Sequence, residues 1–213
     1  MSLWRRLRAH AGPHRDADAS RWVVVDTETS GLDASRDTLL AIGGVAVDAG
    51  GVRPGDSFEA LLHNAPGSPR ANILVHGIGR EAQREGVPAG PALAAFATWM
   101  NGAPCIGFHA EFDRAVLKRA ATLTGIALPG GRWLDLAPLA AVLANDRVAA
   151  LANKSLDDWL LAYGIACHSR HNAASDALAS AELLLRLRSQ AARQGKGTFH
   201  GLLQIAQQGR WLG

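Results

Sequence analysis

Residues 22–28 read Trp-Val-Val-Val-Asp-Thr-Glu, within the longer run RWVVVDTETSGLD at residues 21–33. The continuous apolar start is typical of a central strand that is covered on both faces of its sheet. The same strand ends in two carboxylates, Asp26 and Glu28, spaced two residues apart. Because successive side chains on a strand point to opposite faces, these two acids point the same way. An ordinary core strand has no structural need for such a pair.

The segments around this strand predict a mixed sheet. Apolar runs at residues 38–50 and 52–62, joined by a Gly-Gly turn, predict an antiparallel meander with the first strand. The rest of the chain alternates short strands with helical patterns. We predict strands at residues 104–108 and 132–136, and helices at residues 90–102, 111–125, 137–145, 155–165 and 171–194. This order indicates an α/β fold in which strands 1–3 are antiparallel, parallel strands follow, and helices cover both faces.

The composition is that of one globular domain with short appendages. The chain has 213 residues, of which 48% are hydrophobic, and its two cysteines are Cys105 and Cys167. Two cysteines outside a CxxC pair predict neither a disulfide framework nor a zinc site, so we expect a reducing, cytoplasmic setting. The apolar runs are too short to cross a membrane, and we expect no membrane association. The net charge of +3 is compatible with a polyanionic partner without requiring one.

Three further candidates for chemistry lie far from the first strand in the sequence. Asp113 follows the strand at residues 104–108, in the first turn of a predicted helix, and His171 and Asp176 lie where the long C-terminal helix begins. Each has a structural alternative when taken singly, because acids at helix N-termini complement the helix dipole and a lone histidine can be a surface residue. In open α/β sheets, however, ligands gather at the carboxyl ends of the strands, where all these residues fall. Four carboxylates and one histidine together have the composition of a two-metal site for phosphodiester hydrolysis.

The ordered motifs resemble those of the DEDDh 3′–5′ exonuclease superfamily, which includes the epsilon subunit of bacterial DNA polymerase III, ribonuclease T and oligoribonuclease. Its three motifs correspond to VVVDTETSGLD, GFHAEFDRAVLKRA and RHNAASDALASAELL, while VHGI, WLDLAPLAAVL and SLDDWLLAYGI match the connecting segments in type and order. The resemblance runs from about residue 22 to residue 187. It implies an RNase H-like sheet.

The resemblance also implies a role for each matched residue. Asp26, Glu28 and Asp176 would bind a first divalent ion. Asp26 would bridge to a second ion, which Asp113 would help to hold, directly or through water. His171 would deprotonate the attacking water, since an imidazole can accept a proton near neutral pH. Two divalent ions, Mg²⁺ or Mn²⁺, are the cofactors that this family implies.

Residues beside the first two motifs are implied to contact the terminal nucleotide of the substrate. The expected substrate-binding residues are Thr27, Thr29, Gly31, Leu32, His109 and Phe112. Packing in the core is an equal alternative for Leu32 and Phe112. In the second motif, Phe108 and His109 replace the His-Asn pair that is usual in epsilon subunits, which alters the pocket beside the scissile phosphate and favours a less specialised epsilon-like branch.

These features support three functional hypotheses. The first is a metal-dependent 3′–5′ exonuclease that releases nucleoside 5′-monophosphates from the 3′ end of single-stranded DNA. The second replaces DNA by RNA or short oligoribonucleotides, because only contacts near the 2′-hydroxyl distinguish the two sugars. The third is a catalytically silent module that binds nucleic acid or a polymerase. The expected partners are a single-stranded 3′ end and a DNA polymerase or another replication or repair protein.

We divide the chain into three parts. Residues 1–20 form a basic N-terminal extension, which is either a short amphipathic helix or a loosely held surface terminus. Residues 21–195 form the exonuclease domain. Residues 196–213 form a short C-terminal segment that packs on this domain.

Overall fold

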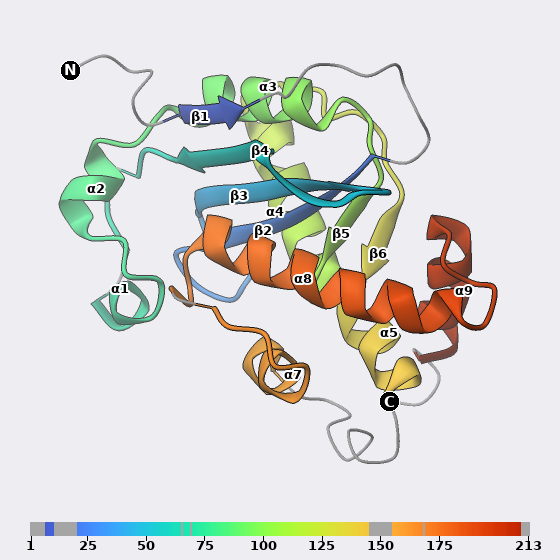
Figure 1. Cartoon of the computed structure of the whole chain (residues 1–213). Coiled ribbons are helices and arrows are strands. Elements are labelled where there is room, and N and C mark those ends of the chain that lie inside the picture. Colours follow the sequence, from blue (N-terminus) through green and yellow to red (C-terminus); the bar gives the residue numbers. More distant parts are fainter. Residues whose placement is uncertain are drawn as a thin grey trace.

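A six-stranded mixed sheet organises the molecule (Figure 1). The structure is a computed structural model that describes residues 7–10, 21–64, 66–68, 70–144, 155–167 and 169–209. The strands are β1 (Leu7–His10), β2 (Trp22–Thr29), β3 (Leu39–Asp48), β4 (Gly51–Leu61), β5 (Cys105–Gly107) and β6 (Trp133–Asp135). The helices are α1 (Arg70–His76), α2 (Arg80–Arg84), α3 (Ala89–Met100), α4 (Ala110–Thr124), α5 (Leu136–Leu143), α7 (Leu156–Ala162), α8 (Ala173–Ala192) and α9 (Phe199–Gly209).

Strand β2 joins the antiparallel and parallel halves of the sheet, whose order is β1-β4-β3-β2-β5-β6. On one side β2 pairs antiparallel with β3, with Val24 opposite Val45. On the other side it pairs parallel with β5, with Val24 beside Ile106. Strands β3 and β4 are antiparallel, and β5 and β6 are parallel. The predicted order, three antiparallel strands followed by parallel strands, is therefore confirmed.

Alternating side chains of β2 separate two apolar layers. Trp22 and Val24 pack into a core with buried residues of α5, α7, α8 and α9, whereas Val23 and Val25 face a second core with α3 and α4. Helices thus cover both faces of the sheet, as predicted (Figure 1). Burial on both faces explains why β2 begins as a continuous apolar run. None of the helices in the described ranges is long and apolar enough to cross a membrane.

Strand β1 departs from the expectation for the N-terminal extension. Residues 7–10 pair antiparallel with β4, with Leu7 opposite Ala60 and His10 opposite Ser57. A helix or a loosely held terminus is therefore wrong for these four residues, and the rest of the extension lies outside the described residues. Without β1, strand β4 would end the sheet with unpaired backbone N–H and C=O groups, which an added strand satisfies.

Helix α9, from the C-terminal segment, lies against α5 and the amino end of β2. The ring of Phe199 meets that of Trp22 edge-on, with centroids 5.4 Å apart. The guanidinium of Arg188 lies 4.6 Å from the Trp22 ring centroid, and that of Arg132 lies 5.1 Å from the Phe199 centroid. The contact of Phe199 with Trp22 attaches α9 to the amino end of β2, which is the end away from Asp26, and the two guanidiniums lie over these rings.

The close approach of α8 to the sheet depends on Gly43. This residue of β3 lies opposite Asp26 in the pairing with β2. A Cβ atom at position 43 would lie 2.1 Å from the backbone carbonyl carbon of Ala173, the first residue of α8. Because glycine lacks this atom, the N-terminal end of α8 contacts the strand directly. This contact brings the first turn of α8, with Asp176, next to β2.

We expect Gly43→Ala to lower the free energy of unfolding by about 1–3 kcal/mol, since a new methyl group must displace the backbone of α8. Chemical denaturation measures this change. Gly55→Ala is the matched control, because a Cβ atom there would have no neighbour within 4 Å. Its free energy of unfolding should stay within about 0.5 kcal/mol of the wild type. Equal unfolding energies for the two variants would show that the contact between α8 and β3 is not tight.

Candidate active site

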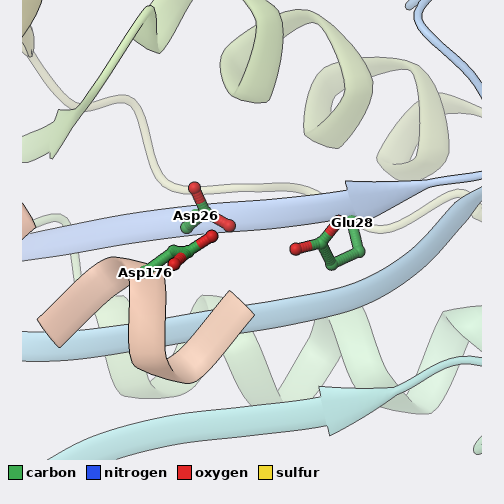
Figure 2. Close-up of side chains that lie close together, drawn as sticks. All are labelled: Asp26, Glu28 and Asp176. Atoms are coloured by element: carbon green, nitrogen blue, oxygen red, sulfur yellow. The ribbon is translucent and has the colours of Figure 1, made fainter. Parts of the chain in front are cut away.

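Three carboxylates converge at the carboxyl end of β2. Asp26 and Glu28 leave the core there and are partly exposed, whereas Val25 before them is buried. Asp176, which is 4% exposed, comes from the first turn of α8. Each residue places a carboxylate oxygen within 4.8 Å of those of the other two (Figure 2). Clustered carboxylate oxygens are the ligands that hard divalent cations prefer, so this group fits such an ion.

Burial and mutual repulsion shift the proton affinity of Asp26 and Glu28. Burial raises the pKa of Asp26 well above its ordinary value, and the charges of Asp113, Asp176 and Glu28 raise it further. Burial and then the charge of Asp176 raise the pKa of Glu28 to about 7. The positive charge of Arg170 lowers both values. Asp26 and Glu28 therefore retain protons at a pH where isolated carboxylates have lost them, unless a further cation binds.

Asp113 adds a fourth carboxyl group from helix α4. It is 4% exposed, and the hydroxyl of Thr27 donates a hydrogen bond of 2.7 Å to its Oδ1. Thr27 lies between Asp26 and Glu28 along β2, so its side chain points to the opposite face of the strand. Burial raises the pKa of Asp113 to about 7, although the hydrogen bond from Thr27 lowers it. Asp113 stands outside the group of three, and its charge reaches Asp26.

The segment before α8 holds Asp176 by both carboxylate oxygens. His171 has a left-handed backbone, with φ of 59°, and its N–H donates a 3.0 Å hydrogen bond to Asp176 Oδ2. Arg170 contacts Oδ1 through Nη1, and the thiol of Cys167 lies 3.5 Å from the same oxygen. His171 itself is exposed. The predicted base is therefore fixed beside a cluster carboxylate through its backbone, while its ring remains accessible.

The predicted substrate-binding residues of the first motif lie on β2 and in the turn after it. Thr27 is buried and its hydroxyl is engaged with Asp113, while the Thr29 hydroxyl donates to the carbonyl of Gly31. A Cβ atom on Gly31 would lie 2.4 Å from the Asp37 carboxylate, so glycine at this position leaves room for the Asp37 side chain. Leu32 is 94% exposed, which rules out core packing for it. Nucleotide contact by these residues stays a prediction.

The second motif places two predicted residues at the start of α4. Phe112 packs in part against the core of α3 and α4, as its core alternative predicts. His109 is exposed, and its left-handed backbone lets its N–H donate a 3.0 Å hydrogen bond to Asp135 Oδ1. The His109 ring meets Phe108 edge-on at 4.6 Å. The Phe-His pair that replaces His-Asn thus forms a ring contact next to α4, and its role toward substrate stays a prediction.

Sequence reasoning missed the ion-pair bridge at this site. Arg170 contacts Asp176 and also places Nε 2.5 Å from Oδ1 of Asp157, in the first turn of α7. Arg170 lies next to His171 in the third motif, so its position in the sequence was a signal. Its acidic partner on α7 was not predictable, because nothing in the sequence places the start of α7 beside that of α8.

The metal-free protein is expected to lose stability as the pH rises from 4.5 to about 7, the interval between the ordinary and the shifted pKa of Glu28. A carboxyl group whose pKa is higher in the folded protein binds more protons when folded, so deprotonation disfavours the folded state. Divalent cations should remove this loss, because they bind the deprotonated form. Melting temperatures across this interval, in EDTA and in Mn²⁺, test the expectation. Glu28→Gln should weaken the pH dependence in EDTA, and a flat wild-type profile there would argue against it.

Comparison with known proteins identifies the family of the domain. Residues 23–184 match RNase_T, the exonuclease family. A DNA polymerase III subunit epsilon-like protein of Rhodobacter capsulatus is 32% identical over 203 residues, which cover 92% of this chain and 28% of the relative. The PolC-type DNA polymerase III of Bacillus subtilis is 26% identical over 190 residues, which cover 88% of this chain and 13% of the relative. The chain thus spans less than a third of the length of these curated relatives.

Solved structures agree on the fold. Escherichia coli exonuclease I in complex with a dT13 oligonucleotide superimposes with a TM-score of 0.69 at 18% identity, over 82% of this chain and 42% of that one. Another structure of exonuclease I gives a TM-score of 0.71 at 17% identity, with the same coverage. The mixed sheet with helices on both faces is therefore the RNase H-like exonuclease fold. The matched range includes the whole acidic cluster, and the chain belongs to the RNase_T exonuclease family of the DEDDh superfamily.

Proposed function

We propose that this chain is a metal-dependent 3′–5′ exonuclease that releases nucleoside 5′-monophosphates from single-stranded DNA. The observation that carries the proposal is the convergence of Asp26, Glu28 and Asp176, whose oxygens lie within 4.8 Å of one another. Asp113 is buried beside them. Burial raises the pKa of Asp26, Glu28 and Asp113, so keeping these neighbouring groups charged is costly unless cations bind between them. A catalytically silent module would gain nothing from keeping carboxylates that repel one another.

Two divalent ions, Mg²⁺ or Mn²⁺, fit this donor set. Asp26, Glu28 and Asp176 would hold the first ion, and Asp26 and Asp113 would hold the second. When bound, such a pair stabilises the charge on the attacking and leaving oxygens of a phosphodiester. The chain orients its own ligands: Thr27 fixes Asp113 through the 2.7 Å hydrogen bond, and the backbone N–H next to the cluster fixes Asp176.

His171 is the proposed general base. An imidazole nitrogen accepts a proton from the attacking water and passes it to solvent, to which His171 is exposed. The hydrogen bond from its backbone N–H to Asp176 anchors the residue beside the acidic cluster. The left-handed backbone at this position is what turns the N–H toward Asp176.

Single-stranded DNA is the proposed substrate. Exonuclease I binds a dT13 oligonucleotide on the same fold, and the curated relatives are DNA polymerase III proteins. In this chain, the exposed side chain of Leu32 lies in the turn after β2 and offers an apolar surface to a terminal base. The exposed His109 and the partly buried Phe112 lie where α4 begins, near Asp113. We assign these residues, with the backbone around Thr29 and Gly31, to the terminal nucleotide.

A DNA polymerase or another replication or repair protein is the proposed partner, because the matched relatives are polymerase III proteins. A cytoplasmic setting is part of the same proposal. Both cysteines are free thiols, and Cys105 is buried, which fits a reducing compartment.

Digestion of matched 3′-labelled DNA and RNA oligonucleotides in Mn²⁺ tests the activity and the substrate together. We expect the labelled nucleoside 5′-monophosphate to be released faster from DNA than from RNA. His171→Asn is the control, since it removes the base and leaves the carboxylates in place. Faster release from RNA would assign the chain to the oligoribonucleotide class. No release from either strand would favour a silent binding module.

A further inference from the structure

Arg170 joins two helices at the acidic cluster. Its Nη1 contacts Asp176 Oδ1 at the start of α8, and its Nε lies 2.5 Å from Asp157 Oδ1 at the start of α7. The Arg170 side chain is 24% exposed and that of Asp176 only 5%, so this contact is shielded from solvent, whereas Asp157 is 58% exposed and its contact is open to solvent. Charge-assisted contacts of this kind are stronger than those between neutral groups. Two carboxylates thus hold the guanidinium at the cluster: Asp176 belongs to the cluster, and Asp157 does not.

Both oxygens of Asp176 are already engaged by the protein. Oδ2 accepts the backbone N–H of His171, and Oδ1 meets Arg170 and lies 3.5 Å from the thiol of Cys167. A cation that binds directly to Oδ1 would stand next to the guanidinium. Two positive charges at one carboxylate oxygen repel each other, and the repulsion is strong in a partly buried site. The ion and Arg170 therefore compete for Oδ1.

We propose that Arg170 is a positioning residue that neutralises Asp176 in the metal-free protein and releases Oδ1 when a divalent ion binds. The proposal rests on the role of Asp176 as a metal ligand, given above. Asp157 lies outside the group of three carboxylates and keeps its own contact with Nε. It therefore retains the guanidinium near the cluster after release. In the metal-free protein, Arg170 reduces the repulsion among the carboxylates of the cluster. It also weakens the apparent affinity of the cluster for a divalent ion.

Replacing Arg170 separates this role from a purely structural one. In Arg170→Gln, we expect a lower melting temperature in EDTA, because the carboxylates lose their counter-charge. We expect Mn²⁺ to bind about tenfold more tightly by calorimetric titration, because the competing contact is gone. A residue that only holds α7 against α8 would change stability and leave Mn²⁺ affinity equal or weaker.

Two variants serve as comparisons. Arg53→Gln removes an arginine that pairs with Asp48 at 2.9 Å, in the hairpin of β3 and β4, and should leave Mn²⁺ affinity unchanged. Arg170→Lys keeps the charge but lacks the planar fork that reaches two carboxylates. It should give a Mn²⁺ affinity between those of the wild type and Arg170→Gln. If Arg170→Gln does not fold, the affinity of Arg170→Lys decides the question.

The outcomes distinguish this inference from the proposed function. If the wild type binds Mn²⁺ and the Arg170 variants bind it more tightly, the competition is supported. If the wild type binds Mn²⁺ and the variants bind it equally or more weakly, the role of Arg170 is overturned and the metal site stands. If the wild type binds no Mn²⁺, the metal site and the inference fall together.

Discussion

Asp26→Asn is expected to abolish nucleotide release, with a loss in kcat on the order of 10³-fold or more. The reason is that Asp26 is proposed to bridge the two divalent ions, which act together on the phosphodiester. The amide has nearly the same shape as the carboxylate but carries no charge. It therefore removes the negative charge and one of the two ligand oxygens needed to bridge two ions, without opening a cavity. The rate of release from a 3′-labelled single strand, at saturating Mn²⁺, measures the loss.

The same substitution should not destabilise the metal-free protein. Burial and three neighbouring carboxylates raise the pKa of Asp26, so its negative charge is unfavourable in the fold. A neutral amide removes that repulsion, and the melting temperature in EDTA should equal or exceed that of the wild type. Asp48→Asn, in the hairpin at the other end of the sheet, should leave activity unchanged. Full activity of Asp26→Asn would exclude the cluster from catalysis.

His171→Asn is expected to reduce kcat by about 10² to 10⁴-fold, the usual contribution of a general base. Asparagine tolerates the left-handed backbone that position 171 adopts, and it keeps the N–H that donates to Asp176. The loss should therefore come from the missing base and not from a displaced carboxylate. Calorimetry should show Mn²⁺ affinity close to that of the wild type.

The pH profile gives this second prediction a further check. Hydroxide can replace the missing base, so the deficit of His171→Asn should shrink as the pH rises. A deficit that stays constant with pH, or a large drop in Mn²⁺ affinity, would indicate that the variant acts through Asp176. In that case His171 would be a positioning residue.

The sequence was sufficient for the architecture where local patterns decide it. Four apolar residues before Asp26 predicted a strand buried on both faces, and the period of two predicted that Asp26 and Glu28 share a side. The same period places Thr27 on the other face, but its bond to Asp113 depends on the distance between β2 and α4. No local pattern contains that distance.

Other features depend on contacts between remote segments. Residues 7–10 form a strand because β4 offers them an edge, and a basic tetrapeptide does not predict this. The contact of Gly43 with Ala173 brings α8 onto the sheet, but the sequence shows only an ordinary glycine pair in a strand. The bridge from Arg170 to Asp157 likewise follows from the packing of α7 beside α8.

We propose that the carboxylates of β2, α4 and α8 form a metal-dependent exonuclease site. The product released from a 3′-labelled single-stranded DNA by EDTA-treated protein, during titration with Mn²⁺, tests this proposal directly. We expect no release in EDTA, release that rises and saturates with Mn²⁺, and a product that is the nucleoside 5′-monophosphate. Equal release in EDTA and Mn²⁺, a 3′-phosphate product, or no release at any Mn²⁺ concentration would contradict it.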